Sequence, residues 1–492
     1  MTGITTAAEV LARLEALRAR DLPVHGGRTL AYVYDSGVAE ADAAGRAALA
    51  AFGATNGLDP TAFPSILAME QDLIAFARDL LDGPDSTVGV ATSGGTESIL
   101  LSVLAARDAA AAGTAAAARP SMVLPATAHA AFRKAAHCFG VRPIIVAVDP
   151  QTCRADPASM AAAIDDTTVL VVASAPSYAH GVIDPVAEIA PAAAARGVRC
   201  HVDACIGGWV LPFLEEAGQT AWSFAVEGVT SISLDLHKYG YTPKGISLLL
   251  HRTPDLRHSH LYATADWPGY AVLNSTMQST KSGAPVAAAW AVTQVIGRDG
   301  YLALARAARE ATLVIARGVD GIRGLRVLVR PDSTLLTLAS DRPGDVYRIA
   351  DAMAARGWFV QPQLPYAAFP ATLHLSLSAA TAPLVAEFLT DLSEVVESVV
   401  GAPPIVADPS LVTLLGSLEP DRMDEAVLDG LLAVAGLTVR DGGAAGAGPT
   451  LEFAGGMAEI NLLLEHTPVR VREALLLGVL DRLSRPPKAG TR

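Results

Sequence analysis

Short apolar segments alternate with helical ones from about residue 85 to 250, and this alternation strongly limits how the chain can fold. The apolar segments are 88–91, 121–125, 142–148, 168–174, 198–204, 230–235 and 246–251. Strands that are apolar throughout must be covered on both faces, and helical crossovers between them make neighbouring strands parallel. The pattern therefore predicts an α/β fold with a large, doubly wound, mostly parallel sheet.

The rest of the chain divides around this sheet. We expect a helical and extended N-terminal segment over 1–84 and a large domain over 85–320 that ends in a long helical stretch from 283. Strand–helix–strand patterns predict a smaller α/β domain over 321–400. Residues 401–492 form a C-terminal extension with a glycine-rich insert at 440–450 and one or two closing helices.

Composition excludes several classes of protein. The chain of 492 residues is too long for one small core, and its net charge of −13 argues against a nucleic-acid partner. No run of large apolar residues reaches the ~20 that span a bilayer. The four cysteines have no C-x-x-C spacing, which is typical of reduced thiols in a cytoplasmic protein: Cys138, Cys153, Cys200 and Cys205.

The N-terminus predicts an amphipathic helix. Its apolar residues lie on one helical face, with Glu and Arg between them: Val10, Leu11, Leu14 and Leu17. We expect this helix to dock on the protein itself or on a partner subunit, rather than to act as a signal peptide.

The first segment that carries chemistry is TSGGTESIL at 92–100, directly after an apolar strand. Gly94 and Gly95 let the backbone approach an anion, and the unpaired N–H groups of a helix start point at it. Thr96 adds a hydroxyl. An ordinary capped helix after a tight turn explains the same residues, and the spacing matches neither a Walker loop nor a dinucleotide fingerprint.

An acid and a histidine follow two other strands. Asp203 ends the strand in HVDACIGG, where a carboxylate can hold a metal, cap a helix or pair with a protonated ring nitrogen. No further ligands at useful spacing lie nearby, so we predict no metal site. His129 stands just after the segment 121–125, where an imidazole can stack on a planar ring or only end a helix.

A lysine follows the strand at 230–235, in SLDLHKYGYTPKG at 233–245. A lysine attacks carbonyls when burial or neighbouring positive charge lowers its pKa. Beside Lys238, His237 is suited to binding phosphate or to packing. Taken alone, the His-Lys pair is equally typical of a solvated loop.

These segments together match the needs of one cofactor, pyridoxal 5′-phosphate. Its phosphate needs a helix start, its ring a stacking group, its pyridine nitrogen a carboxylate and its aldehyde a lysine. Because each segment follows a strand, they should meet at one edge of the sheet. The predicted cofactor-binding residues are Gly94, Gly95, Thr96, His129, Asp203, His237 and Lys238.

The same segments carry a resemblance to a known family. The matching stretches are GGRTLAYVY (26–34), FPSILAMEQDL (63–73), TSGGTESIL (92–100), AHAAFRKAAH (128–137), SAPSYAHGVIDPV (174–186), HVDACIGGW (201–209), SISLDLHKYGYTPKGIS (231–247), WPG (267–269) and RGW (356–358). They resemble the pyridoxal-phosphate-dependent decarboxylase superfamily and, within it, the sphingosine-1-phosphate lyase branch. The resemblance spans most of the chain except about 400–455. It implies an aspartate aminotransferase-like fold and a homodimer with shared active sites. In contrast to the human-type member of the family, we expect no membrane anchor.

The resemblance also implies roles for residues. The catalytic residues would be Lys238, which forms the Schiff base, Asp203 at the pyridine nitrogen and His129 on the ring face. Gly94, Gly95, Thr96 and His237 would bind the cofactor phosphate. The substrate end would include Tyr32, Tyr34, Asn56 and Lys244, with the tyrosines reaching a partner's site and the N-terminal segment contributing to the dimer.

The implied reaction is retro-aldol cleavage of a 2-amino-3-hydroxy substrate to an aldehyde and an amine product such as phosphoethanolamine. A decarboxylase on the same cofactor site is the alternative. A decarboxylase must hold the substrate carboxylate, and no arginine in the matching motifs is placed to do so. A scaffolding role without activity is disfavoured because Lys238, Asp203 and His129 are all present.

Three substitutions depart from the lyase pattern. Asp59 replaces a family histidine, and an acid there would repel a phosphate by about 1–4 kcal/mol at ~4 Å. Tyr270 replaces a glycine after Trp-Pro-Gly. Lys281 replaces an arginine and cannot reproduce bidentate phosphate binding. These changes predict a substrate that differs from that of the family.

Overall fold

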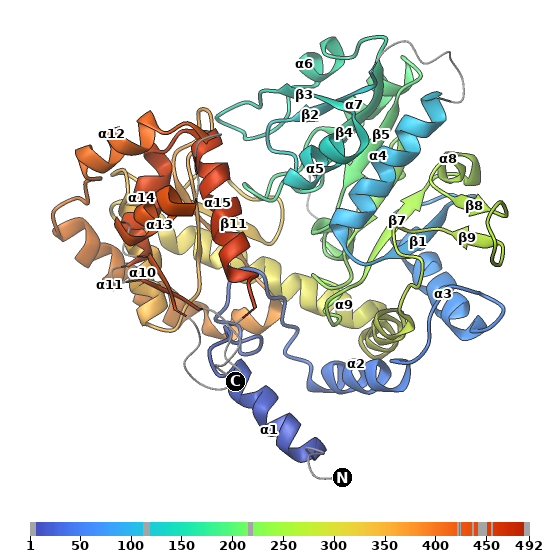
Figure 1. Cartoon of the computed structure of the whole chain (residues 1–492), viewed down its shortest axis with the longest axis horizontal. Helices are drawn as coiled ribbons and strands as arrows, with labels where there is room; N and C mark the ends of the chain where they lie inside the picture. Colours follow the sequence, from blue (N-terminus) through green and yellow to red (C-terminus); the bar gives the residue numbers. More distant parts are fainter. Residues whose placement is uncertain are drawn as a thin grey trace.

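A seven-stranded sheet forms the centre of the larger body in the computed structural model (Figure 1). The structure describes residues 6–111, 119–214, 220–420, 423, 425–434, 437–440, 450–453 and 456–486. The strand order is β1-β7-β6-β5-β4-β2-β3, and β7 alone runs antiparallel to its neighbours. The strands are β1 Val88–Thr92, β2 Ser121–Pro125, β3 Arg142–Val146, β4 Thr168–Ser174, β5 Arg199–Asp203, β6 Val229–Leu234 and β7 Ser247–His251. The predicted mostly parallel sheet is confirmed.

Helices cover both faces of this sheet, as the alternation of β4 shows. Val171 and Ala173 pack in one apolar cluster with α3 (Pro64–Leu80) and α7 (Val186–Ala194). Leu170 and Val172 pack in another with α4 (Gly95–Ala111) and α5 (Ala130–Phe139). Successive strand residues point to opposite faces, so a strand that is apolar throughout feeds two cores. Shorter helical segments complete this body: α6 Pro157–Ala162, η1 Gly207–Trp209, η2 Leu211–Phe213 and α8 Pro254–His258.

A long helix, α9 (Gly283–Val319), runs between the two bodies of the molecule (Figure 1). Its first part packs in the core of the large sheet and its last part in the second core. The predicted helical stretch is interrupted at Gly297, where φ is 61° and ψ is 175°. Glycine adopts this left-handed conformation without a side-chain clash, so it allows the kink.

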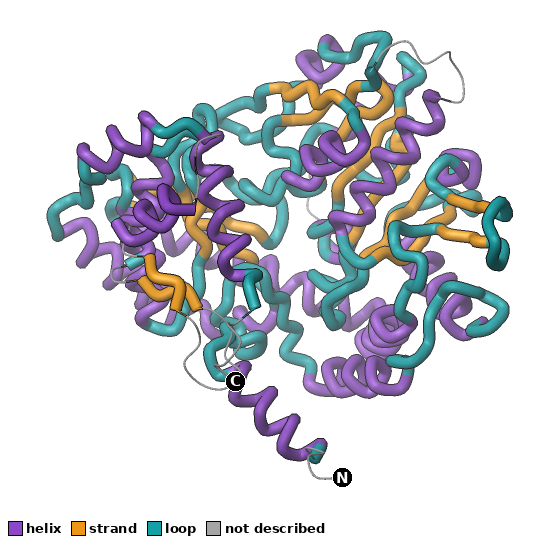
Figure 2. The backbone as a smooth tube through the Cα atoms, in the orientation of Figure 1, coloured by secondary structure: helices purple, strands orange, loops and turns teal. Residues whose placement is uncertain are grey.

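The second body contains a four-stranded antiparallel sheet of order β10-β11-β13-β12, which is separate from the large sheet (Figure 2). Its strands are β10 Leu325–Val327, β11 Leu335–Ser340, β12 Gln361–Gln363 and β13 Thr372–Ser376. The helices α10 (Asp345–Ala355) and α11 (Val385–Gly401) pack in the same core as this sheet and the last part of α9, and η3 (Ala379–Leu384) leads into α11. The predicted strand–helix–strand elements are present; the domain boundaries stay a prediction.

The N-terminal helix α1 (Ala7–Arg18) extends away from the body (Figure 1) and has no buried residue. Its apolar residues are 45% to 61% exposed: Val10, Leu11, Leu14 and Leu17. The helix therefore does not dock on its own chain, and docking on a partner subunit stays a prediction. The next helix, α2 (Ala39–Ala51), packs against α9.

The C-terminal extension contains α12 Pro409–Ser417, α13 Glu425–Val434, the antiparallel pair β14 Leu437–Arg440 and β15 Thr450–Phe453, α14 Met457–His466 and α15 Val469–Leu483. The two closing helices match the prediction, while the glycine-rich insert lies, apart from its ends, outside the described residues. A hairpin of β8 (Tyr262–Thr264) and β9 (Val272–Asn274) was not predicted, because three-residue strands leave little periodicity. No helix in the described part of the chain is long and apolar enough to cross a membrane.

Buried histidines should make the stability of the fold depend on pH. Burial lowers the pKa of His201 and His260 to about 4 and that of His374 to about 3. The unfolded chain binds protons at these rings near the ordinary pKa of 6.5, whereas the folded chain does not. We expect full stability above pH 6.5 and a loss, as the pH falls toward 4, of about 1.4 kcal/mol per pH unit for each such ring. Urea unfolding at pH 7.5, 6 and 5 measures this slope.

The variant His260→Phe tests the cause. Both ring nitrogens of His260 lack a hydrogen-bond partner among the described residues, and the residue is 4% exposed. Phenylalanine fills the space without a titrating group. The dependence of the unfolding free energy on pH should therefore become less steep by the contribution of one histidine. His137→Gln, a change at an exposed histidine, should leave it unchanged. Equal slopes in the wild type and His260→Phe would contradict the explanation.

Candidate active site

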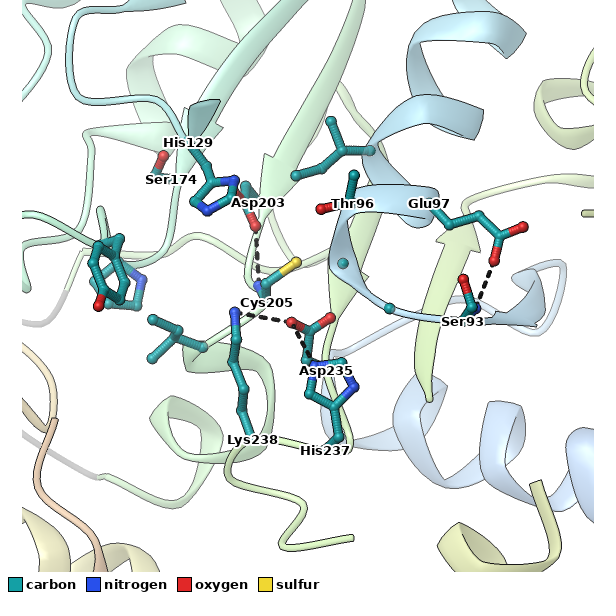
Figure 3. Close-up of a pocket in the computed structure, with 16 residues that line it drawn as sticks. Ser93, Thr96, Glu97, His129, Ser174, Asp203, Cys205, Asp235, His237 and Lys238 are labelled. Carbon is teal, nitrogen blue, oxygen red and sulfur yellow. Dashed lines mark hydrogen bonds and ion pairs between the residues drawn. The ribbon is translucent and has the colours of Figure 1, made fainter. Parts of the chain in front are cut away.

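One cavity of about 330 Å³ lies at the carboxyl ends of the parallel strands of the large sheet (Figure 3). The loops that follow β1, β2, β4, β5 and β6 each supply part of its wall. All seven residues predicted to bind the cofactor line it: Gly94, Gly95, Thr96, His129, Asp203, His237 and Lys238. The structure thus brings together groups that are up to 144 residues apart in the chain, from Gly94 to Lys238. The carboxyl edge of an open α/β sheet is the expected position for a ligand.

The start of α4 forms one wall of the cavity. The amide groups in the first turn of a helix have no partner within the helix, so they are available to an anion. Glu97 holds the loop in place, because one carboxylate oxygen accepts from the Ser93 amide at 2.6 Å and the other from the Met277 amide at 2.7 Å. A Cβ on Gly95 would lie 2.7 Å from Cys205 Sγ and 2.8 Å from an Asp235 oxygen. This close approach requires glycine.

His129 has a fixed orientation. Its Nδ1 accepts a hydrogen bond from the Ala131 amide at 3.2 Å, so the ring caps the N-terminus of α5. The ring faces the cavity together with Asp203 (Figure 3). The two readings of this histidine, a helix end and a stacking group, are therefore compatible.

Asp203 is held by its own strand-end neighbours. Its Oδ1 accepts from the Cys205 amide at 3.1 Å, and the hydroxyl of Ser233 lies at 3.5 Å from the same oxygen. The residue is buried, 7% exposed, at the end of β5. A carboxylate fixed in this way can bind a cationic ring nitrogen without reorganising.

Lys238 forms an ion pair that was not predicted. Its Nζ lies 2.9 Å from Oδ2 of Asp235, which is 2% exposed (Figure 3). Burial opposes the charge on both groups, but their mutual attraction dominates: the pKa of Lys238 is raised and the pKa of Asp235 is lowered. The lysine is therefore an ammonium in this structure. The sequence contained one indication of this pair, because Asp235 is an acid at the end of a strand, as Asp203 is.

The tautomer of His237 follows from its neighbours. Nδ1 accepts from the Ile246 amide at 3.3 Å, and burial lowers the pKa of the ring. The proton of the neutral ring is therefore on Nε2, which lies 3.7 Å from Asp235 Oδ2 in the cavity wall. His237 is thus a neutral hydrogen-bond donor, suited to a phosphate oxygen.

Three residues predicted for the substrate end, Tyr32, Tyr34 and Lys244, lie beside the lysine loop and do not line the cavity. Lys244 Nζ donates to the carbonyl oxygens of Tyr32 at 2.9 Å and His237 at 3.1 Å, and lies 5.1 Å from the centre of the Tyr34 ring. Burial, and then the charge of Lys238, lower the pKa of Lys244 to about 8. Tyr34 packs edge-on against Tyr239 of the same chain. Contact of these tyrosines with a partner's site stays a prediction.

Four other residues of interest do not line this cavity: Asn56, Asp59, Tyr270 and Lys281. Asp59 is exposed and accepts from the amide and hydroxyl of Thr61. The Asn56 side chain accepts from the Leu58 amide. Contact between Asn56 and a substrate stays a prediction.

Tyr178 is a cavity residue that the sequence did not single out. Its hydroxyl donates to Gln361 Oε1 at 2.7 Å, and its ring stacks on His374 with the centroids 4.2 Å apart. Both partners belong to the second sheet, so Tyr178 ties the cavity to that sheet. No sequence pattern links residues 178 and 374.

Lys281 is engaged in a structural ion pair. Its Nζ lies 2.7 Å from Glu70 Oε2, and Glu70 Oε1 accepts from the Ala91 amide at 2.6 Å. We expect Lys281→Met to lower the free energy of unfolding by about 3–5 kcal/mol, because it leaves a buried carboxylate unpaired. Urea unfolding of Lys281→Met, Glu70→Gln and the double variant measures the coupling. Additive losses in the double variant would contradict a strong pair.

Comparison with known proteins assigns the family. The model of the pyridoxal-dependent decarboxylase conserved domain matches residues 42–322. The chain belongs to the pyridoxal-dependent decarboxylase family. Its cofactor is pyridoxal phosphate, and the predicted fold class is confirmed. A second model, the C-terminal putative HTH domain of pyridoxal-dependent enzymes, matches residues 409–482, within the C-terminal extension.

Relatives within this family include lyases. Sphingosine-1-phosphate lyase of Dictyostelium discoideum is 34% identical over 76% of this chain and 72% of its own. The rat protein named sphingosine-1-phosphate lyase 1 is 34% identical over 82% and 70%. The solved sphingosine-1-phosphate lyase of Burkholderia pseudomallei has a TM-score of 0.75 at 34% identity, over 81% of this chain and 92% of its own. Glutamate decarboxylase of Lactobacillus brevis, at 19% identity and TM-score 0.72, over 82% of this chain and 95% of its own, shows the shared fold.

The cavity of this family member fits pyridoxal phosphate. The helix start and the Nε2–H of His237 offer donors to a phosphate, and Asp203 offers a fixed carboxylate. Oδ1 of Asp235 is buried and has no hydrogen-bond partner among the described residues, so an acceptor as well as donors faces the cavity.

Proposed function

We propose that this pyridoxal-phosphate enzyme is a carbon–carbon lyase that cleaves a 2-amino-3-hydroxy substrate to an aldehyde and an amine. Its relatives named sphingosine-1-phosphate lyase, at 34% identity, support this proposal. The carrying observation is the composition of the cavity: no arginine is among the described residues that line it. A decarboxylase has to hold the carboxylate of its substrate, for which arginine is the usual group.

The residues of the chain divide the work. Bound pyridoxal phosphate supplies the electron sink for bond cleavage at the substrate's α-carbon. Lys238 would hold the cofactor through its aldehyde and would give way to the substrate amine. Asp203 keeps the ring nitrogen protonated, and His129 fixes the ring plane. The start of α4 and His237 hold the phosphate.

We further propose that the substrate is phosphorylated or carries another anionic end that meets Lys244. The ammonium of Lys244 lies at the His237 end of the lysine loop and is held by two backbone carbonyls. Tyr32, whose φ of 65° is in the left-handed region, is fixed by one of these bonds. Within the same chain, Asp59 and Lys281 add no positive charge beside Lys244. We therefore also propose that the preferred substrate differs from that of the lyase relatives.

A cytoplasmic homodimer is the proposed form of the enzyme. Apolar side chains on and beside the β8–β9 hairpin are exposed, by 39% to 66%, and so favour an interface: Leu261, Tyr262, Leu273 and Met277. Free cysteines support a reducing compartment. In such a dimer, Asn56, Tyr270 and the tyrosines of the N-terminal segment would serve shared sites.

Product analysis tests the proposal. The purified holoenzyme is incubated with a phosphorylated sphingoid base, with its dephosphorylated form, and with glutamate and aromatic amino acids. We expect a long-chain aldehyde and phosphoethanolamine from the first. Carbon dioxide from an amino acid, with no aldehyde from either sphingoid base, would establish the decarboxylase alternative instead.

A further inference from the structure

The cavity contains a second carboxylate, that of Asp235, which neither the predicted cofactor contacts nor the proposed roles use. Asp235 directly follows β6 and is 2% exposed. One oxygen, Oδ2, lies 2.9 Å from Lys238 Nζ and 3.7 Å from His237 Nε2. Figure 3 shows the carboxylate between the lysine and the start of α4.

The position of this carboxylate is fixed from several sides. Its oxygens lie 2.8 and 2.9 Å from the place of a Cβ on Gly95, so the start of α4 lies directly against the carboxylate on one side. The Asp235 amide donates to the Cys205 carbonyl at 3.2 Å, and the Lys238 amide donates to the Asp235 carbonyl at 3.4 Å. The second bond closes a turn in which the acid at position i meets the lysine at position i+3, and the first ties this turn to the loop after β5.

We propose that Asp235 is a positioning residue, which holds Lys238 as an ammonium aimed into the cavity and thereby sets the pH range over which the lysine reacts with an aldehyde. The proposal rests on the proposed role of Lys238 as the group that binds the cofactor. It assigns a function to Asp235, whose presence in the cavity cofactor binding alone does not explain. A buried carboxylate next to a phosphate site is otherwise unfavourable, because like charges repel.

The chemistry requires the lysine to change its protonation state. Only the neutral amine attacks a carbonyl carbon. The ammonium first releases one proton, and the neutral nitrogen bonds to the aldehyde carbon while the carbonyl oxygen takes a proton from the nitrogen and becomes a hydroxyl. The proton released first then joins this hydroxyl, the carbon–oxygen bond breaks, and the oxygen leaves as water. Asp235 opposes the first step by attracting the ammonium. It also favours return of a proton to the lysine whenever the nitrogen is free.

Other groups near the pair cannot replace this effect. The titratable and charged groups that face Lys238 and Asp235 come from the N-terminal segment, the β4, β5 and β6 loops and the segment before β7: Tyr34, Tyr178, Asp203, Cys205, His237 and Lys244. Burial raises the pKa of Tyr34, Tyr178 and Cys205, so these groups stay neutral. Lys244 adds positive charge, which works against the ammonium. Asp235 is the carboxylate in direct contact.

The experiment uses cofactor-free full-length protein and pyridoxal, which lacks the phosphate, as the probe. Adducts are trapped with borohydride, and the labelling rate at Lys238 is measured by mass spectrometry from pH 6 to 9.5. In the wild type we expect a rate that still rises at pH 9.5. In Asp235→Asn the rate should level off at least about one pH unit lower and be about tenfold or more faster at pH 7. Repeating the series with pyridoxal phosphate separates the effect on the lysine from relief of phosphate repulsion.

Glu70→Gln is the matched control, because it breaks another buried lysine–carboxylate pair away from Lys238. Its pH profile of labelling at Lys238 should match the wild type. A profile of Asp235→Asn equal to the wild type would overturn the proposal. If Asp235→Asn does not fold, the pH profile of the wild type is the test. A labelling rate that levels off below pH 9 means that the pKa of Lys238 is below that of a free lysine, and this result also overturns the proposal.

Failure of the proposed function gives a different result. If Lys238 is labelled with the expected pH profile but no aldehyde forms from the amino alcohols, the role of Asp235 is supported and the lyase function is refuted. If the wild type cleaves its substrate but Asp235→Asn is labelled with the same pH profile as the wild type, the lyase function is supported and the role of Asp235 is refuted.

Discussion

We expect Lys238→Ala to abolish the visible absorbance of covalently attached pyridoxal phosphate in the purified holoenzyme, and to lower the cleavage rate by on the order of 10⁴-fold or more. The reason is that Lys238 is the lysine that lines the cavity. Lys244 cannot substitute, since its ammonium is held by the carbonyls of Tyr32 and His237. Absorbance spectra of the supplemented protein and initial rates of aldehyde formation provide the measurement.

Lys134→Ala is the control for this change. Lys134 is exposed on α5 and outside the cavity, so both absorbance and rate should equal those of the wild type. Visible absorbance that persists in Lys238→Ala, or its absence from fresh, supplemented wild-type protein, would refute the assignment of the lysine.

Asp203→Asn should lower the cleavage rate by about 10²–10³-fold, or ~3–4 kcal/mol in the transition state. The carboxamide keeps the size of the side chain but cannot hold a proton on the pyridine nitrogen by charge. Because Oδ1 is anchored by the Cys205 amide, the variant should retain the fold and the cavity. Rates at saturating cofactor, together with the thermal midpoint, separate lost catalysis from lost folding.

A chemical rescue distinguishes charge from geometry. Pyridoxal phosphate methylated on its ring nitrogen is permanently cationic and needs no carboxylate to stay charged. Replacing pyridoxal phosphate by this methylated form should raise the cleavage rate of Asp203→Asn by a larger factor than that of the wild type. Ser233→Ala, which removes the 3.5 Å neighbour of Oδ1 and keeps the carboxylate, should cost far less. Equal behaviour of wild type and variant with both cofactor forms would refute an electrostatic role.

Much of the fold was predictable because it rests on local patterns. Segments such as VLVVAS in β4 are apolar throughout, and this property identifies a strand that is buried on both faces. The kink at Gly297 and the β8–β9 hairpin were not predictable, since a single glycine inside a helical pattern is ambiguous and a three-residue strand carries no period.

The predicted cofactor residues were found through chemistry at strand ends. Gly94, His129 and Lys238 each follow a strand and Asp203 ends one, and parallel strands bring such residues to one edge. Tyr178 was missed because its partners Gln361 and His374 lie far along the chain. The state of Lys281 was missed for the same reason: its carboxylate, Glu70, is 211 residues away.

The sequence by itself determined the sheet, the order of its strands along the chain and the set of residues that meet at its edge. These properties follow from hydrophobic periodicity and strand direction, which are local. The tertiary structure alone decided the charge states. It placed Asp235 2.9 Å from Lys238, put the proton of His237 on Nε2 and bound Lys281 to Glu70. Protonation depends on burial and on distances of a few ångströms, which a sequence pattern does not contain.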